Sequence, residues 1–222
     1  MTTPSVSARI VFDLDGTLID SAPDIHAIAN EVLVLEGCAP IALEETRRFV
    51  GNGAAVFVAR MRGARGLPDA AQERMHDAFV ARYDRAVGRT HPYPGVAEAL
   101  SDLQAAGHRL GICTNKPIKP ALAVLAHLNL DGWFGVVIGG DSLIVKKPDP
   151  APLEAAFEAL GQGPMIYVGD SEVDTETAER LGVPFLLFTE GYRKTPVNKL
   201  PHAAAFDDYA HLGGLVDNLL KR

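Results

Sequence analysis

The stretch RIVFDLDGTLID, residues 9–20, decides the predicted fold. Residues 10–12 are β-branched and aromatic, which favours a buried strand. Asp13 and Asp15 follow this run, and Gly16 ends it. Because alternate residues of an extended chain project to the same face, we expect the two carboxylates to lie side by side where the strand ends. Two neighbouring negative charges need a cation or a proton, so the pattern predicts a reaction centre; the alternative is an ordinary Asp-Gly turn.

The composition of the chain limits the kinds of partner it can have. Its 222 residues, 47% hydrophobic and 22% charged, suit a globular domain with a smaller insert. The net charge of −7 gives no basic excess, so we expect no nucleic-acid partner. No apolar run has the length of a signal peptide or membrane span, which predicts no membrane association and a cytoplasmic location. The two cysteines have neither metal-binding nor disulfide-framework spacing.

The segment after the first strand is predicted to be entirely helical. Apolar residues recur at helical spacing over residues 22–35, 43–50, 54–62 and 68–87. The prolines and glycine of residues 91–95 then mark a boundary. We therefore predict a helical bundle over residues 21–91, inserted into a larger domain formed by residues 1–20 and 92–222.

From residue 96 onward, strand and helix patterns alternate. Strands are predicted at residues 109–113, 136–138, 165–168 and 185–188. Helices are predicted at residues 96–106, 118–128, 150–160, 173–181 and 207–220. Short apolar strands joined by helices are typical of a doubly wound parallel sheet, so we expect an α/β fold with a Rossmann-like core.

Polar side chains follow the predicted strands. They are Asp13 and Asp15, Thr114 and Asn115, Asp170, and Lys146 with Lys147 in the loop after residues 136–138. In such folds, ligands bind outside the carboxyl ends of the strands. Carboxylates arriving from different strands suit Mg²⁺, an oxygen-liganded ion that often bridges to phosphate. An Asp can serve as the nucleophile in phosphoryl transfer, and a second Asp can protonate the leaving oxygen.

Four segments resemble, in order and spacing, the motifs of phosphatases in the haloacid dehalogenase superfamily. They are DLDGT at residues 13–17, CTNK at 113–116, KKPDP at 146–150 and GDSEVD at 169–174. The resemblance covers nearly the whole chain. It includes a helical insert after the first motif, as in members with a helical cap, and implies that residues 21–91 are a cap domain on a catalytic core. It implies a phosphomonoester hydrolase, because superfamily members that cleave carbon–halogen bonds lack an acid at the position of Asp15.

The resemblance also implies roles for the catalytic residues. Asp13 is the implied nucleophile and Asp15 the general acid and base. Asp13, the backbone carbonyl of Asp15, and Asp170 would hold Mg²⁺. Lys147 would neutralise the phosphoryl group, and Lys146 is the alternative for this role.

The remaining motif residues have implied roles around the phosphate. Thr114 would hydrogen-bond the phosphoryl group, with Asn115 nearby. Thr17 would present its backbone N–H to the phosphate, or its hydroxyl would serve only the turn. Asp174 would belong to the metal shell, or would be an acid favoured at a helix N-terminus.

The cap is expected to select the substrate. Gly51, Asn52 and Gly53 open a predicted helix, either as an anion site or as a turn that lets helices pack closely. FVGNG at residues 49–53, with GGDSLIVKKPDPAPL at 139–153, is similar to phosphoglycolate phosphatases. This similarity implies 2-phosphoglycolate as the substrate. The candidate cations for its carboxylate are Arg47, Arg48, Arg60 and Arg65.

The predicted function is therefore a Mg²⁺-dependent phosphatase that forms an aspartyl phosphate and acts on 2-phosphoglycolate, as a monomer or a homodimer. A phosphomutase resembling β-phosphoglucomutase is one alternative, since such mutases share the helical cap and both first-motif aspartates. A catalytically idle binding protein on the same fold is the other.

Overall fold

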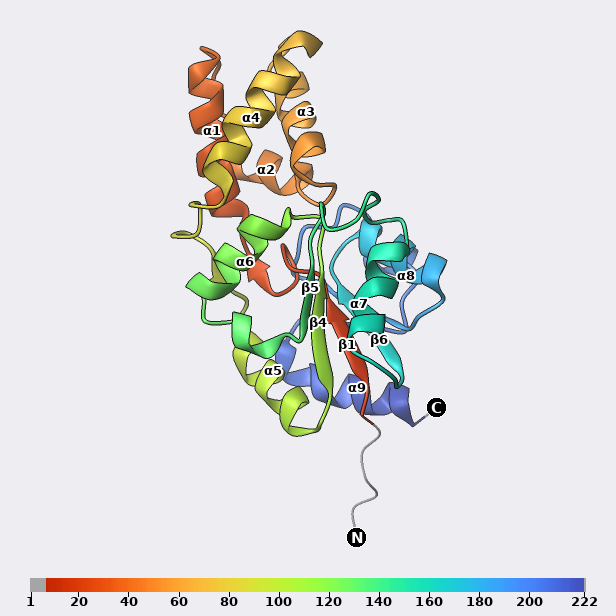
Figure 1. The fold of residues 1–222 in the computed structure, drawn as a ribbon. Coiled ribbons are helices and arrows are strands. Elements are labelled where there is room, and N and C mark those ends of the chain that lie inside the picture. The colour runs from red at the N-terminus through yellow and green to blue at the C-terminus, as the bar shows by residue number, and fades with distance from the viewer. Residues whose placement is uncertain (1–6, 222) are drawn as a thin grey trace.

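A six-stranded parallel sheet forms the centre of the structure, a computed structural model that describes residues 7–221 (Figure 1). Residues 1–6 and Arg222 lie outside the described residues. The strand order is β5-β4-β1-β6-β7-β8. The strands are β1 (Arg9–Phe12), β4 (Arg109–Cys113), β5 (Val136–Ile138), β6 (Met165–Gly169), β7 (Phe185–Phe188) and β8 (Ala204–Phe206).

Helices cover both faces of this sheet, because successive residues of each strand point to opposite sides. Ile10 and Phe12 belong to a cluster with residues of α5 (Val96–Ala105), α6 (Ile118–His127) and α9 (Leu212–Leu220). Val11 belongs to a second cluster with residues of α7 (Ala151–Ala159) and α8 (Glu172–Leu181). Strands buried on both faces explain why the strand segments are nearly continuous apolar runs.

Four helices between Asp20 and His91 form a separate layer above the carboxyl ends of the strands (Figure 1). They are α1 (Ala22–Leu35), α2 (Leu43–Phe49), α3 (Ala54–Ala64) and α4 (Gln72–Tyr83). Their apolar sides enclose a core of their own, which includes Ile25, Phe57 and Phe79. The chain enters and leaves through β2 (Ile19–Asp20) and β3 (His91–Pro92), which pair antiparallel. The predicted doubly wound α/β fold with an inserted helical cap is confirmed.

Two predicted helices differ clearly from the observed elements. The helix predicted over residues 68–87 is a 3₁₀ turn, Asp69–Ala71, followed by the shorter α4. Val87 packs against the core of the sheet rather than in the cap, which requires the helix to end before it. The helix predicted over residues 207–220 starts only at Leu212, and β8 precedes it. Among the described residues, no helix is both long and apolar enough to cross a bilayer.

Candidate active site

The candidate site lies at the end of β1, where the strand order changes direction across the sheet. β1 is central, with β4 on one side and β6 on the other. Asp13 follows β1, Thr114 follows β4 and Asp170 follows β6. Because neighbouring connections leave such a switch point in opposite directions, a crevice opens at the carboxyl ends of the strands. The parallel register therefore gathers the predicted polar residues at this crevice.

Lys147 is the centre of a buried polar network. Its Nζ lies 2.8 Å from Oδ1 of Asp13, 2.7 Å from Oδ1 of Asp174 and 2.8 Å from the hydroxyl of Tyr167. The Tyr167 hydroxyl donates to the same oxygen of Asp174 at 2.7 Å. All four side chains are buried. The ammonium group is therefore held at a fixed position beside the Asp13 carboxylate.

Two carboxylates of the site bind protons more tightly than usual. Burial raises the pKa of Asp13 to about 7; Lys147 opposes this shift and the Asp174 charge adds to it. Burial likewise raises the pKa of Asp170 well above its usual range, with further contributions from Asp174 and Asp13. Both pKa values are raised because a negative charge is unfavourable in a buried site. A bound cation would offset this unfavourable free energy.

A divalent cation fits this group of carboxylates. Asp13, Asp170 and Asp174 each offer an oxygen, and these atoms lie within 4.8 Å of one another. Buried carboxylate oxygens are the ligands that Mg²⁺ prefers. Thr17 and Tyr192 hold Asp170 in place, through hydrogen bonds from the Thr17 hydroxyl at 2.8 Å and the Tyr192 backbone N–H at 2.6 Å.

Gly16 allows the loop after β1 to approach Asp170 closely. Its φ is +88°, and a Cβ at this position would lie 2.6 Å from Oδ2 of Asp170. Only glycine combines this backbone conformation with so short an approach. In the same turn, the backbone N–H of Thr17 donates to the carbonyl of Leu14 at 3.2 Å. The structure thus places the Thr17 hydroxyl on Asp170 and its N–H within the turn.

Asp174 accepts hydrogen bonds from three residues, one of which is the Tyr167 described above. Its Oδ1 accepts from Lys147, and its Oδ2 accepts from the backbone N–H and hydroxyl of Ser171, at 3.1 and 2.6 Å. The contact with Ser171 is a capping box at the start of α8. Burial alone would raise the pKa of Asp174, but the Lys147 charge and these hydrogen bonds lower it. Asp174 is therefore an ionised carboxylate that holds the Lys147 ammonium in place.

The predicted residues of the second and third motifs join the core to the cap. Asn115 donates from Nδ2 to the carbonyl of Gly51 at 3.0 Å, and Lys146 donates to the carbonyl of Asn52 at 2.9 Å. Gly53, with a φ of +85°, precedes the first residue of α3. Of the two lysines, Lys147 thus contacts Asp13, whereas Lys146 contacts the cap.

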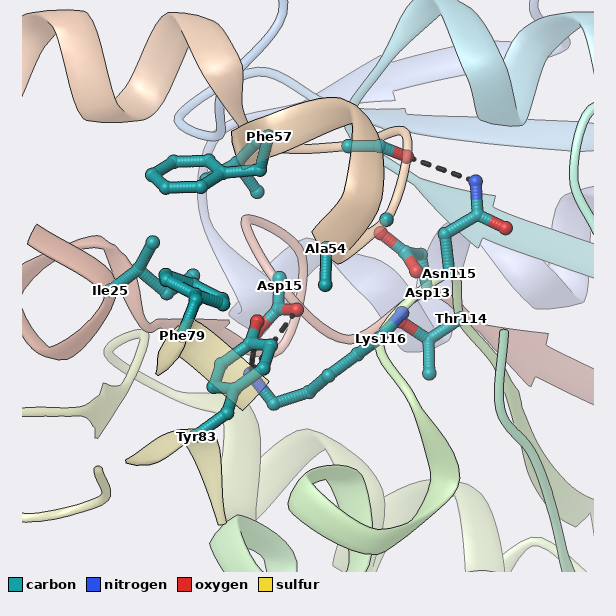
Figure 2. A pocket seen from close by; sticks show the side chains of 13 residues that line it. Asp13, Asp15, Ile25, Ala54, Phe57, Phe79, Tyr83, Thr114, Asn115 and Lys116 are labelled. Atoms are coloured by element: carbon teal, nitrogen blue, oxygen red, sulfur yellow. Dashed lines mark hydrogen bonds and ion pairs between the residues drawn. The ribbon is translucent and has the colours of Figure 1, made fainter. Parts of the chain in front are cut away.

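Lys116 contacts Asp15, a relationship that sequence reasoning missed. Its Nζ lies 3.1 Å from Oδ1 of Asp15 and 3.0 Å from the hydroxyl of Tyr83 at the end of α4 (Figure 2). The Ser21 hydroxyl donates to the same carboxylate oxygen at 2.6 Å. Burial disfavours the charge of Lys116, but Asp15 outweighs it and raises the pKa of the lysine. The CTNK motif contained this lysine, but nothing in the local sequence pattern indicated its partner in α4.

Two cavities open beside Asp13 and Asp15, and both residues line each of them. The narrow cavity has a volume of about 30 Å³. It extends under the cap to Thr114 and Lys116. The wider, outer cavity has a volume of about 330 Å³ and extends past Asp170 to Arg60.

The four predicted arginines have different surroundings. Arg60 lines the wider cavity and donates to the Phe49 carbonyl and to Oδ1 of Asn52, at 2.9 and 2.8 Å. Arg47 pairs with Asp20 and Arg65 with Glu45, each at 3.1 Å. Arg48 is exposed on α2.

The buried carboxylates and Lys147 lie together at the carboxyl ends of the strands and beneath the helical cap, where α/β folds bind ligands. The family model described as haloacid dehalogenase-like hydrolase matches residues 8–210. The chain belongs to this family, and within it the chain is a phosphatase.

The relatives and solved structures agree with this assignment. The chain is 48% identical to a phosphoglycolate phosphatase of Cereibacter sphaeroides, covering 95% of this chain and 98% of the relative. It is 42% identical to a phosphoglycolate phosphatase of Rhodospirillum rubrum, covering 92% and 88%. The crystal structure of a predicted phosphoglycolate phosphatase from Haemophilus somnus superposes with a TM-score of 0.88 at 30% identity, covering 94% and 97%.

A structure with bound phosphate is also similar. CbbY from Rhodobacter sphaeroides, in complex with phosphate, superposes with a TM-score of 0.76 at 25% identity, covering 96% of this chain and 98% of CbbY.

Proposed function

We propose that the protein is a Mg²⁺-dependent phosphatase that hydrolyses 2-phosphoglycolate through an aspartyl phosphate on Asp13. The observation that carries the chemistry is the placement of Asp13 at the end of β1, 2.8 Å from Lys147. The relatives named phosphoglycolate phosphatase support the substrate. The domains of this enzyme would be a core of residues 1–20 and 92–222 and a cap of residues 21–91.

In the first half-reaction, a carboxylate oxygen of Asp13 attacks phosphorus and the bond to the leaving oxygen breaks. Lys147 and the Thr114 hydroxyl would stabilise the charge on the phosphoryl oxygens. Asp15 gives a proton to the leaving glycolate oxygen. In the second half-reaction, Asp15 takes a proton from water as the water attacks phosphorus, which releases phosphate and regenerates the Asp13 carboxylate.

Asp13, the backbone carbonyl of Asp15, and Asp170 would hold the metal ion. When bound, Mg²⁺ would neutralise charge on the phosphoryl group. Asp174 would orient Lys147 through its Oδ1 and would belong to the metal shell, directly or through a water molecule. Asn115 and the turn formed by residues 51–53 would close the site from the cap side.

A panel of phosphate esters tests this proposal. Phosphate release would be measured from 2-phosphoglycolate, sugar phosphates and nucleoside monophosphates, with Mg²⁺ and with EDTA. We expect metal-dependent release with the highest kcat/KM on 2-phosphoglycolate. Conversion of a sugar phosphate to its isomer without free phosphate would instead identify a mutase. A folded protein that releases no phosphate from any ester would contradict the proposed function.

A further inference from the structure

Lys116 is a buried cation at the junction of core and cap. Asp15 and Lys116 belong to the core, and Tyr83 belongs to the last turn of α4 in the cap. The Lys116 ammonium also lies 4.2 Å from the centroid of the Tyr83 ring. Such contacts hold a flexible lysine in one position.

The surroundings of Lys116 are largely apolar. Ile25 of α1, Phe57 of α3 and Phe79 of α4 line the narrow cavity together with Asp15 (Figure 2). Of the described residues that line this cavity, Lys116 is the only one that carries a positive charge. In a water-poor cavity, an anion binds favourably only where a cation compensates its desolvation.

We propose that Lys116, held by Tyr83, binds the carboxylate of the substrate and thereby determines specificity for 2-phosphoglycolate. This inference rests on the proposed function. In 2-phosphoglycolate, one methylene group separates the leaving oxygen from the carboxylate. A leaving oxygen within hydrogen-bonding distance of Asp15 would place the carboxylate within reach of the Lys116 ammonium, which lies 3.1 Å from Asp15 and is the one cation among the described residues that line this cavity.

The cap arginines are less suited to this carboxylate. The Arg60 guanidinium already donates to the Phe49 carbonyl and to Asn52, and it lines the wider, outer cavity. Arg47 and Arg65 are paired with carboxylates of the protein. Lys116 is also paired, but its partner Asp15 is the group that must turn to the leaving oxygen during the reaction. The substrate carboxylate would then share or replace Asp15 as the partner of Lys116.

The test compares two substrates that differ chiefly in the carboxylate, 2-phosphoglycolate and ethyl phosphate. The measured quantity is the ratio of their kcat/KM values. Both esters have alkyl leaving groups, so a general effect of a variant on Asp15 largely cancels in the ratio. Lys116→Met removes the charge and keeps the aliphatic chain. We expect the ratio to fall about 10- to 100-fold, the size of a lost charged hydrogen bond, mainly through KM for 2-phosphoglycolate.

Two further variants make the test decisive. Tyr83→Phe keeps the ring and removes the hydroxyl contact, so we expect a fall in the ratio of about 2- to 10-fold. Arg60→Met is the matched control, because it removes one of the two cations, Arg60 and Lys194, among the described residues that line the outer cavity. The ratio for this variant should stay within about threefold of the wild-type value. Circular dichroism of each variant verifies folding. If Lys116→Met does not fold, the kcat/KM ratio of Tyr83→Phe tests the inference in its place.

An unchanged ratio in folded Lys116→Met, or in Tyr83→Phe where the lysine variant does not fold, would overturn the inference. A fall in Arg60→Met alone would assign the carboxylate to the outer cavity and would also overturn it. Both results require a wild-type enzyme that hydrolyses 2-phosphoglycolate. A wild-type enzyme without this activity would show that the proposed function itself is wrong.

Discussion

The Nζ atom of Lys147 lies 2.8 Å from Oδ1 of Asp13, and both side chains are buried. Burying two charges costs desolvation free energy that their mutual attraction only partly offsets. The pair is therefore a costly feature to keep for stability alone. Its position beside Asp170 and Asp15, at the carboxyl end of β1, fits a role in binding a phosphoryl group.

Replacing Lys147 should damage both activity and stability. Lys147→Met leaves Asp13 and Asp174 without their shared cation, which we expect to lower the free energy of unfolding by about 3–5 kcal/mol. The loss of charge stabilisation should lower kcat about 100- to 1,000-fold. Denaturant unfolding and phosphate release measure the two effects.

Lys146→Met is the matched control for this variant. Lys146 contacts the Asn52 carbonyl at the cap, so its loss should change kcat by less than about tenfold. A larger loss of kcat in Lys146→Met than in Lys147→Met would reverse the assignment of the two lysines.

Asp13→Asn should abolish turnover and leave the fold intact. The amide has nearly the same size as the carboxylate but is not a nucleophile. Phosphate release and circular dichroism measure the two properties. A variant that keeps most of its activity would remove Asp13 as the nucleophile.

Asp15→Asn should affect substrates according to their leaving groups. We expect hydrolysis of alkyl phosphates to slow about 100- to 10,000-fold, the usual contribution of a general acid and base. Release of p-nitrophenolate needs no proton, so the loss on p-nitrophenyl phosphate should be clearly smaller. Equal losses of kcat on both substrates would argue against Asp15 as the general acid.

Much of this site could be predicted from the sequence because strand ends are marked locally. Apolar runs that stop at Asp13, Thr114 and Asp170 identify the carboxyl ends of three strands, and parallel pairing brings those ends together. The strands over residues 109–113, 136–138 and 185–188 are observed with the predicted limits.

The missed features depend on contacts between distant segments. Tyr83 contacts Lys116 only because α4 packs over the core. The hydrophobic periodicity of the sequence predicts the helix but not where it packs. β8 has only three residues, and it is defined by pairing with β7 rather than by its own composition. The turn before α9 is fixed by the Tyr209 hydroxyl, which donates to the Thr17 carbonyl at 2.6 Å.

Mg²⁺ should stabilise the protein more at high pH than at low pH. The folded-state pKa of Asp13, about 7, lies above its ordinary value of 3.8, and that of Asp170 is also raised. Between these pH values, the folded metal-free protein holds protons that the unfolded chain has released, so its stability falls as the pH rises. A metal ion that replaces these protons binds better as the pH rises.

Thermal unfolding at about pH 5.5 and pH 8, with Mg²⁺ or EDTA, measures this effect. The Mg²⁺-induced increase in Tm should be larger at the higher pH. Asp170→Asn should reduce the increase at both pH values. A larger increase at the lower pH would contradict the assignment of Asp13 and Asp170 as the ionised ligands.

The most direct test of the account is the rate of phosphate release from 2-phosphoglycolate by one sample of enzyme in three successive conditions. The rate would be measured with Mg²⁺, after chelation with EDTA, and after Mg²⁺ is restored in excess. The account predicts rapid release, loss of release on chelation, and recovery when the metal returns. Release that continues undiminished in EDTA, or no release in any condition from a folded protein, would contradict it.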